Sequence, residues 1–418
     1  MFKKLSVLIV TAFVDMVGLL MVLPLMPFYA RDLGAGSLMV TVLVSAFTAA
    51  QLLSAPLWGR FSDRYGRRPA LIVGLGSAAI AYVVFGYATS IWLILLSRIV
   101  QGAGGGTVGV IQAYVADATE PNQRAKALGW LSAATSVGVA LGPPLGSVAL
   151  SMWGRPGPGV AAAMLCAVNI LFCYVYLPEA RDMVAAKSAE NAPRRSREAV
   201  VRVFTHPHEA APKLIWIYAI AMGAFQGMTA ILALFLADRF GLTPDKVWIF
   251  FTYIGAISFV TRAGVLGRLV DKYGEERIAL GGLILLCLGL ATMPLARAIS
   301  FPLPGFETVT LSRYFVLAVS IALLPLGTAF TFPCVTSMLS RVISANERGL
   351  YMGVQQTFGG LGRIIVPLWA GFAYDRFGKT VPFFTSSLLV VIAISLSYRV
   401  NVSRRSKPLP EPVSELAQ

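Results

Sequence analysis

Long apolar stretches separated by short polar segments dominate this chain. A run of about 20 apolar residues is enough to cross the roughly 30 Å of hydrocarbon in a bilayer. Such runs predict twelve spans, at about 5–29, 38–58, 70–88, 91–114, 126–150, 159–177, 213–236, 246–266, 278–296, 311–338, 349–372 and 381–398. The expected fold class is therefore an all-α membrane protein. The first run resembles a signal peptide, but Asp15 at its centre and the lack of a small-residue cleavage site favour a span.

Basic residues are distributed unevenly between the two sets of connecting segments. The segments that join even to odd spans, together with both ends, hold 24 of the 35 Lys and Arg residues, whereas the opposite loops hold eight. Because cytoplasmic segments carry the excess of positive charge, both termini are expected in the cytoplasm and the protein in the cytoplasmic, or inner, membrane.

The overall composition supports a membrane protein and argues against other classes. Hydrophobic residues make up 56% of the 418 residues and charged residues 13%, with a net charge of +15. The charge follows the topology, so we expect contact with the lipid bilayer and no binding of nucleic acid. Four cysteines without paired spacing predict buried free thiols, and His206 and His208 lack further ligands, so no metal and no cofactor are expected.

The chain contains an internal repeat. Gly59, Asp63 and Gly66 recur 208 positions later as Gly267, Asp271 and Gly274, and Arg124, Gly129, Gly138 and Pro143 recur 224 positions later as Arg348, Gly353, Gly362 and Pro367. The longest polar stretch separates the two copies, with a short amphipathic helix expected from Arg197 to Phe204. We therefore expect a six-helix bundle at 1–177, a cytoplasmic linker at 178–212, a second bundle at 213–400 and a cytoplasmic tail at 401–418, with a cavity between two pseudo-symmetric bundles.

Four motifs give the chain a specific family resemblance. They are Gly59-x-x-x-Asp63-Arg64-x-Gly66-Arg67-Arg68, Arg98-x-x-Gln101-Gly102-x-Gly104, Gly138-x-x-x-Gly142-Pro143-x-x-Gly146, and Asp15 followed by Pro24-x-x-Pro27. Together they resemble the twelve-span drug:proton antiporter branch of the major facilitator superfamily, which includes bacterial tetracycline and multidrug exporters. The resemblance extends from Leu5 to Tyr398 and implies alternating access. A membrane enzyme or receptor is not expected, because the sequence shows no nucleotide-binding loop, no metal-ligand cluster and no extramembrane segment large enough for a domain. A monomer is expected.

Asp15 is the acidic residue that lies deepest in a predicted span, about ten residues or roughly 15 Å from its end. An ionised carboxyl at that depth is costly unless it is paired or hydrated, so Asp15 is a candidate for binding and releasing protons. Arg98 in span 4 lies at a comparable depth, and the resemblance implies a role for it in proton transfer. A structural role remains the alternative for both residues.

Close helix packing and conformational gating are expected at further motif residues. Gly138, Gly142 and Gly146 form a smooth stripe on span 5, and Pro143 should bend that helix. The resemblance places this stripe at the contact between the halves. Plain close packing is the alternative. The resemblance assigns gating to the loop between spans 2 and 3 and to its copy in the second half. In the first half, Asp63 is expected near span 11 and Arg67 close to Asp117. The gating residues of the two loops are Gly59, Asp63, Arg64, Gly66, Arg67, Gly267, Asp271 and Gly274.

The repeat itself predicts one ion pair. Arg67 corresponds to Glu275 and Asp117 to Arg341, so both members of the first-half pair recur with exchanged signs. We therefore expect Glu275, or its neighbour Glu276, to lie close to Arg341 and to influence which face of the protein is closed.

Several polar residues in the spans are candidates for contact with a small-molecule substrate: Gln51, Gln226, Gln356 and Arg363. An apolar cavity with few polar groups suits an amphipathic compound. The predicted function is efflux of such a compound in exchange for protons, and the alternative is a proton-coupled importer or facilitator of a sugar or organic anion. The tetracycline exporters that the chain resembles carry additional ionisable groups in the second half, whereas spans 8 and 9 here contain no His and no acidic residue, which disfavours tetracycline. With one acidic residue against Arg98 and Arg363 in mid-span, neutral, zwitterionic or anionic substrates are the first to test.

Overall fold

The computed structural model describes residues 2–119, 124–179, 195–297, 299–301, 309–344 and 347–398, and most of them are helical. Among these residues, nine helices are long and apolar enough to cross a membrane. The fourth, eleventh and twelfth predicted spans fall outside that set. The fourth is divided into two short helices, the eleventh is long but more polar, and the twelfth has 17 residues. The count of twelve spans therefore stays a prediction.

The first group of helices covers the first copy of the repeat. It consists of α1 (Phe2–Val22), α2 (Met26–Asp32), α3 (Ser37–Tyr65), α4 (Arg67–Gly86), α5 (Ile91–Ala103), α6 (Thr107–Ala118), α7 (Arg124–Trp153) and α8 (Gly157–Tyr176). Helix α1 packs against α7 and α8, α4 against α8, and α3 against α5. Pro24, which lacks a backbone N–H, stands in the turn that separates α1 from α2.

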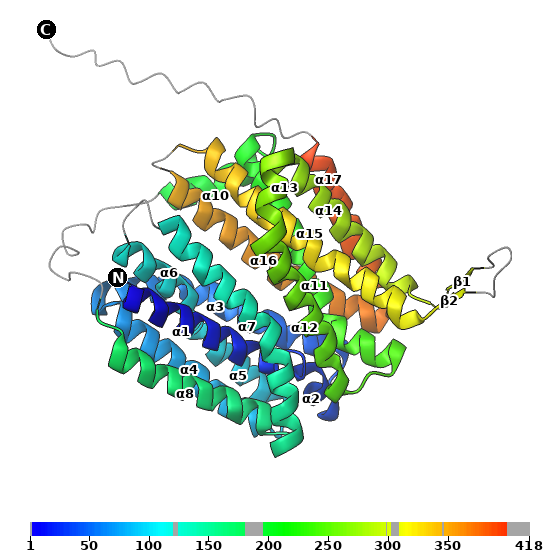
Figure 1. Cartoon of the computed structure of the whole chain (residues 1–418), viewed down its shortest axis with the longest axis horizontal. Coiled ribbons are helices and arrows are strands. Elements are labelled where there is room, and N and C mark those ends of the chain that lie inside the picture. Colours follow the sequence, from blue (N-terminus) through cyan, green and yellow to red (C-terminus); the bar gives the residue numbers. More distant parts are fainter. Residues whose placement is uncertain are drawn as a thin grey trace, which may run out of the picture.

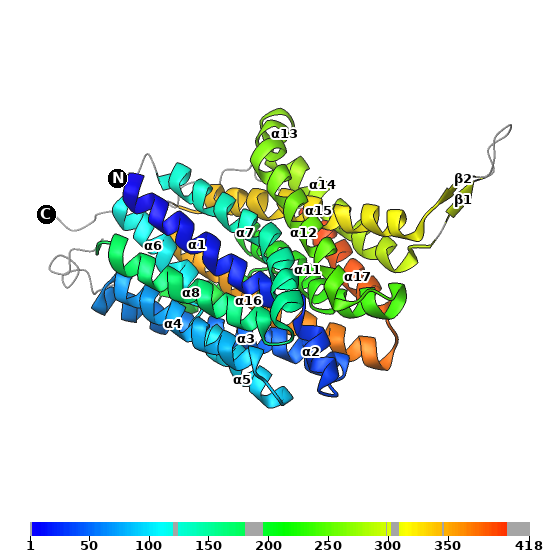
Figure 2. The same ribbon diagram turned by 60° about the horizontal axis from the view of Figure 1, so that its bottom comes forward.

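The second group repeats this arrangement after a short helix, α10 (Arg195–Thr205). It consists of α11 (Ala210–Phe240), α12 (Pro244–Val260), the π-turn Thr261–Val265, α13 (Leu266–Tyr273), α14 (Glu275–Thr292), the 3₁₀ turn Met293–Leu295, α15 (Arg313–Val342), α16 (Arg348–Arg376) and α17 (Val381–Ser397). Strands β1 (Ile299–Phe301) and β2 (Val309–Leu311) pair antiparallel and project away from the helices (Figures 1 and 2).

The two groups lie side by side. Figure 1 shows α1 to α8, in blue to green, on one side and α11 to α17, in green to red, on the other. Helices α7 and α12 pack against each other, as do α3 and α16, and these two pairs join the groups. Helix α11 is apolar on most sides and is the most enclosed of the candidate spans. The division into domains at residues 178–212 stays a prediction.

Equivalent positions of the repeat adopt equivalent structures. Gly66 ends α3 and precedes α4 with φ of +104°, and Gly274 stands between α13 and α14 with φ of +81°. Residues other than glycine rarely adopt this backbone conformation, which explains why both copies keep glycine. Gly138 on α7 faces α1, and its counterpart Gly362 on α16 faces α11. The repeat found in the sequence is therefore also present in the packing.

The expected amphipathic helix is present in the linker. Ala199 and Val203 of α10 are buried, whereas Val201 and Phe204 are exposed, and α10 packs against α16 and α11. Arg202 pairs with Glu209 at 2.9 Å, and this hydrogen bond raises the pKa of the guanidinium. Residues 180–194 of the linker, and the tail from 399 onward, lie outside the described residues.

Large apolar side chains cover much of the outer surface of the helices. Leu53, Trp92 and Leu388, on three different helices, are 78%, 65% and 62% exposed. A soluble protein rarely exposes so many large apolar side chains, but lipid favours them. The chain is therefore a multi-pass membrane protein.

Candidate functional site

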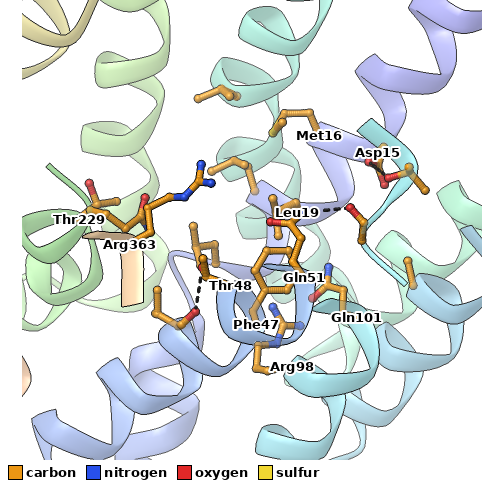
Figure 3. Close-up of a pocket in the computed structure, with 18 of the residues that line it drawn as sticks. Asp15, Met16, Leu19, Phe47, Thr48, Gln51, Arg98, Gln101, Thr229 and Arg363 are labelled. Atoms are coloured by element: carbon orange, nitrogen blue, oxygen red, sulfur yellow. Dashed lines mark hydrogen bonds between the residues drawn. The ribbon is translucent and has the colours of Figure 1, made fainter. Parts of the chain in front are cut away.

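A cavity of about 400 Å³ lies between the two groups of helices, enclosed by α1, α3, α4, α5, α6, α7, α11, α12 and α16 (Figure 3). Its walls are mostly apolar, with Leu19, Phe47, Phe225 and Phe251 among them. The polar and charged side chains that line it are Asp15, Thr48, Gln51, Tyr82, Arg98, Gln101, Thr107, Gln226, Thr229 and Arg363. The arrangement has the character of a site for a small molecule with a large apolar part.

A break in the fourth span shapes one wall of this cavity. Helix α5 ends at Ala103, Gly104 to Gly106 form a turn, and α6 begins at Thr107. A Cβ on Gly104 or Gly106 would collide with Ser77 or Trp58, so the turn needs glycine. The exposed backbone carbonyls find partners, because the Trp58 indole donates to Ala103 and Gln51 Nε2 donates to Gly105 at 3.0 Å. Non-helical backbone at membrane depth is tolerated where its groups are paired in this way or face a cavity.

The broken helix also supplies the partner of Asp15. The Thr107 hydroxyl, in the first turn of α6, donates to Asp15 Oδ2 at 3.1 Å. Asp15 is half-buried and lines the cavity from α1 (Figure 3). A carboxyl with one hydroxyl partner and access to the cavity has room to accept a proton on its other oxygen.

Arg98 lines the same cavity but forms no ion pair with Asp15. It is 1% exposed, and its guanidinium lies 5.4 Å from the centre of the Phe85 ring. Its Nε and one terminal nitrogen have no hydrogen-bond partner among the described residues. Asp15 and Arg98, which the sequence places at a comparable depth, thus line one cavity but make no direct contact.

The candidate substrate residues line this cavity or a second one next to it. Gln51, Gln226 and Arg363 line the first, and Gln51, Gln356 and Arg363 line the second, which measures about 440 Å³. Gln356 Nε2 also contacts the Tyr218 hydroxyl at 3.4 Å. The second cavity extends toward the end of the molecule that carries Arg67, which we call the Arg67 end, because Gly59, Ser62, Arg67 and Gly353 line it.

The glycine stripe on α7 faces a different helix from the one expected. A Cβ on Gly138 would lie 2.9 Å from the Phe13 carbonyl oxygen, and a Cβ on Gly142 would lie 2.6 Å from Leu20 Cβ, so both face α1 in the same group. Gly146 likewise faces α1, at Met21. The contact between the groups instead involves the neighbouring face of α7, where Ala140 approaches Gly255 of α12. The close packing was predicted correctly, and the partner was wrong.

The loop between α3 and α4 is held by short polar contacts at the Arg67 end. Arg67 contacts Asp63 at 2.9 Å and donates to Ser62 at 2.9 Å. Glu179 accepts from the backbone amides of Arg67 and Arg68, so it caps α4 with a negative charge. The side chain of Asp117 lies outside the described residues, so its expected contact with Arg67 stays a prediction, as does the position of Asp63 near span 11.

The remaining loop residues take less specific positions. The Arg64 guanidinium lies 5.4 Å from the centre of the Tyr65 ring. A Cβ at Gly59 or Gly267 would meet open space, so neither glycine is required by packing in this conformation. Asp271 lies on the exposed surface of α13. A gating role for these residues stays a prediction.

The ion pair predicted from the repeat is present. Arg341 contacts Glu275 Oε1 at 2.6 Å, and the Ser337 hydroxyl donates to the same oxygen at 2.8 Å. Glu275 begins α14 and Arg341 stands in the last turn of α15, and these helices pack together in the second group. The pair therefore does not itself join the two groups, and its influence on which face is closed stays a prediction.

A second polar cluster, not predicted from the sequence, joins the groups at the opposite end. Arg31 of α2 makes two hydrogen bonds to Asp238 of α11, at 2.6 and 2.7 Å. Asp238 also accepts from the Tyr374 hydroxyl at 2.7 Å and lies 3.7 Å from Lys379. We call these four residues the Arg31 cluster.

Asp375 adds a further connection at this end of the molecule. Its two carboxylate oxygens accept from the backbone amides of Ser37 and Leu38, at 3.1 and 2.8 Å. The last turn of α16 thus caps the N-terminus of α3 across the boundary between the groups.

Some signals for the missed residues were present in the sequence. Three consecutive glycines, Gly104 to Gly106, inside an apolar span indicate a discontinuous helix, which often borders a binding site. For Arg31 and Asp238 the sequence carries no comparable signal, because 207 positions separate the two residues.

Comparisons with known proteins agree with this architecture. The family model described as Major Facilitator Superfamily matches residues 8–306 and 264–417. "Multidrug resistance protein 2" of Bacillus subtilis (strain 168) is 27% identical over 399 residues, which cover 94% of this chain and 93% of that protein. "Tetracycline resistance protein, class B" of Escherichia coli is 28% identical over 283 residues, 67% of this chain and 69% of that protein.

A solved structure gives the same result for the fold. The nucleoside transporter NupG superposes with a TM-score of 0.73 at 14% sequence identity, covering 96% of this chain and 99% of that one. At this level of identity the likeness concerns the fold alone.

Proposed function

Because this chain belongs to the major facilitator superfamily, and is a membrane transporter rather than an enzyme, we propose that it exports a small amphipathic compound in exchange for protons. Transport would proceed by alternating access, in which the central cavity opens to one side of the membrane and then to the other. The full-length similarity to a multidrug resistance protein supports export, and the mostly apolar cavity suits an amphipathic substrate.

The single observation that supports proton coupling best is the environment of Asp15. Among the described residues that line the central cavity, Asp15 is the one that carries an acidic side chain. It accepts a hydrogen bond from the hydroxyl of Thr107, which follows the break between α5 and α6. Proton-coupled transport requires a group that binds a proton from one side and releases it to the other. We assign this role to Asp15, with Arg98 as a charge in the same cavity that stabilises the ionised state.

The same cavity provides the surface that binds the transported compound. We assign substrate contacts to Gln51, Gln226, Gln356 and Arg363, which line the two adjacent cavities from both groups of helices. Each group contributes side chains, so a relative movement of the groups changes both access and binding. A single chain contains the whole site, in agreement with a monomer as the transporting unit.

The conformation follows from the positions of the cavities and of the Arg31 cluster. The cavities extend toward the Arg67 end, and the Arg31 cluster with Asp375 connects the groups at the other end. From the distribution of Lys and Arg we assign the Arg67 end, and both termini, to the cytoplasm. In this assignment the structure represents the inward-facing state, which receives substrate from the cytoplasm.

Transport into everted membrane vesicles tests this proposal. Everted vesicles that contain the protein and are acidified by respiration should accumulate an exported compound, and an ionophore that collapses the pH gradient should abolish the accumulation. A panel of labelled amphipathic compounds and metabolites identifies the cargo. Accumulation in right-side-out vesicles with an acidic exterior, and none in everted ones, would contradict export and support the proton-coupled importer.

A further inference from the structure

The charged side chains of the central cavity carry a net positive charge. Among the described residues that line it, Arg98 and Arg363 are basic and Asp15 is acidic. An arginine remains protonated in proteins, so the lining carries one positive charge when Asp15 is ionised and two when Asp15 is neutral. A cationic substrate is therefore repelled in both states, and an anionic one is attracted.

The Arg363 side chain extends into this cavity without a partner among the described residues. Figure 3 shows it reaching from α16 toward the space between the groups, on the opposite side from Asp15. No hydrogen bond or ion pair joins it to another described residue, and its Nε is buried without a partner. A guanidinium has five N–H donors, and leaving them unpaired in an apolar setting is costly.

Arg98 presents the same feature from the other group of helices. It is 1% exposed, and two of its nitrogen atoms lack hydrogen-bond partners in the part of the chain that the structure describes. The Phe85 ring beside it compensates part of its charge, since a cation over an aromatic face is stabilised. Arg363 has no such aromatic partner among the described residues, and it is therefore the better candidate for a direct contact with a ligand.

We propose that the central cavity binds a small organic anion, with a carboxylate or sulfonate held by the Arg363 guanidinium and an aromatic or aliphatic body against Phe47, Phe225 and Phe251. A guanidinium matches both oxygens of such a group in a bidentate geometry. Arg98 adds a favourable charge from the other side. This inference rests on the proposed function, because it takes the cavity to be the transport site, and it narrows the substrate class that the sequence leaves open.

Dyes that share one ring system and differ in charge provide a direct test. The purified protein is titrated with fluorescein, an anion, and with tetramethylrosamine, a cation with the same xanthene core, and binding is followed by fluorescence anisotropy. Competition by a panel of amphipathic carboxylates, sulfonates and matched amines extends the comparison. We expect fluorescein or members of the anionic panel to bind, and the cations to bind at least about tenfold more weakly.

Variants then locate the binding group. Arg363→Gln should weaken the affinity for anions about tenfold to a hundredfold, the effect of losing hydrogen bonds to a charged group. Arg363→Lys should weaken it less, because the charge is kept. Arg262→Gln is the matched control, since Arg262 is also a half-buried arginine in the second group with an unpaired Nε but lines neither cavity. If Arg363→Gln fails to fold, Arg363→Met serves in its place.

The possible outcomes are distinct. Binding of cations or neutral compounds in preference to anions, equal affinity of the wild type and Arg363→Gln for anions, or no binding of any compound would each overturn the inference. Binding of anions through Arg363 without their movement in proteoliposomes would leave the anion site intact and refute the proposed transport function. Transport of cations alone would support transport and refute the anion site.

Discussion

The Arg31 cluster should determine how strongly the protein favours the conformation that is closed at the Arg31 end. Replacing Asp238 with Asn keeps the size of the side chain but removes its charge, so Arg31 loses an ionic partner with which it makes two hydrogen bonds of 2.6 and 2.7 Å. The Tyr374 hydroxyl can still donate to the amide oxygen, so the substitution affects mainly the ionic contacts.

The size of the effect follows from the exposure of the pair. Hydrogen bonds to charged groups contribute about 1.5–3 kcal/mol each when desolvated. The Arg31 side chain is 33% exposed and that of Asp238 16%, so solvent screening reduces the total to about 1–2 kcal/mol. If the pair exists only in this conformation, the ratio of the two conformations should change by roughly 5- to 30-fold, since about 1.4 kcal/mol corresponds to a factor of ten.

The distribution of distances between two spin labels, measured by double electron–electron resonance, reports the ratio of the two conformations. Labels at Tyr87, which follows α4, and at Lys246, in the first turn of α12, are exposed and lie near the Arg31 end on different groups. Asp238→Asn should increase the population with a long distance between the labels. Arg202→Gln breaks the exposed Arg202–Glu209 pair at 2.9 Å and should leave the distribution unchanged. An unchanged distribution in Asp238→Asn would refute the assignment of the Arg31 cluster as a closure.

Three further substitutions test other parts of the account. Gly142→Ala should lower the free energy of unfolding by about 1–3 kcal/mol, because its Cβ would lie 2.6 Å from Leu20 Cβ. Gly129→Ala on the same helix is the control, since its Cβ would meet open space and should not destabilise the protein. Equal melting temperatures of the two variants would contradict the α1–α7 packing. Arg341→Glu should reduce the transport rate. Adding Glu275→Arg should restore only part of that rate, because Ser337 and the N-terminus of α14 favour an acidic residue at position 275. An unchanged rate in Arg341→Glu would show that the pair is dispensable. Asp63→Ala should strongly reduce transport at normal membrane abundance, and near-normal rates would limit the loop to a role in topology.

The helices were predictable because their cause is local. A run of about 20 apolar residues has few alternatives to a membrane helix, since every backbone group must be paired in lipid. The repeat was equally visible, and it led to the Glu275–Arg341 contact because two sign changes at corresponding positions indicate that the pairing is kept. These features depend on sequence spacing, which the chain displays directly.

Other features depend on which helices become neighbours. The glycines of α7 indicate close packing, but only the tertiary structure shows that the partner is α1 rather than a helix of the other group. The Arg31–Asp238 contact likewise arises from the packing of the two groups. The three glycines at Gly104 to Gly106 do indicate the break in the span, but the contact of Thr107 with Asp15 depends on the packing of α6 against α1.

Proton movement by the Asp15→Asn variant in proteoliposomes tests the central claim most directly. The amide resembles the protonated carboxyl and can still contact Thr107, but it cannot bind and release a proton. Addition of substrate to liposomes with the wild-type protein should change the internal pH, whereas the variant, inserted normally and still able to bind substrate, should give no pH change. Undiminished substrate-driven proton movement by the variant would contradict the assignment of Asp15 as the proton-coupling residue.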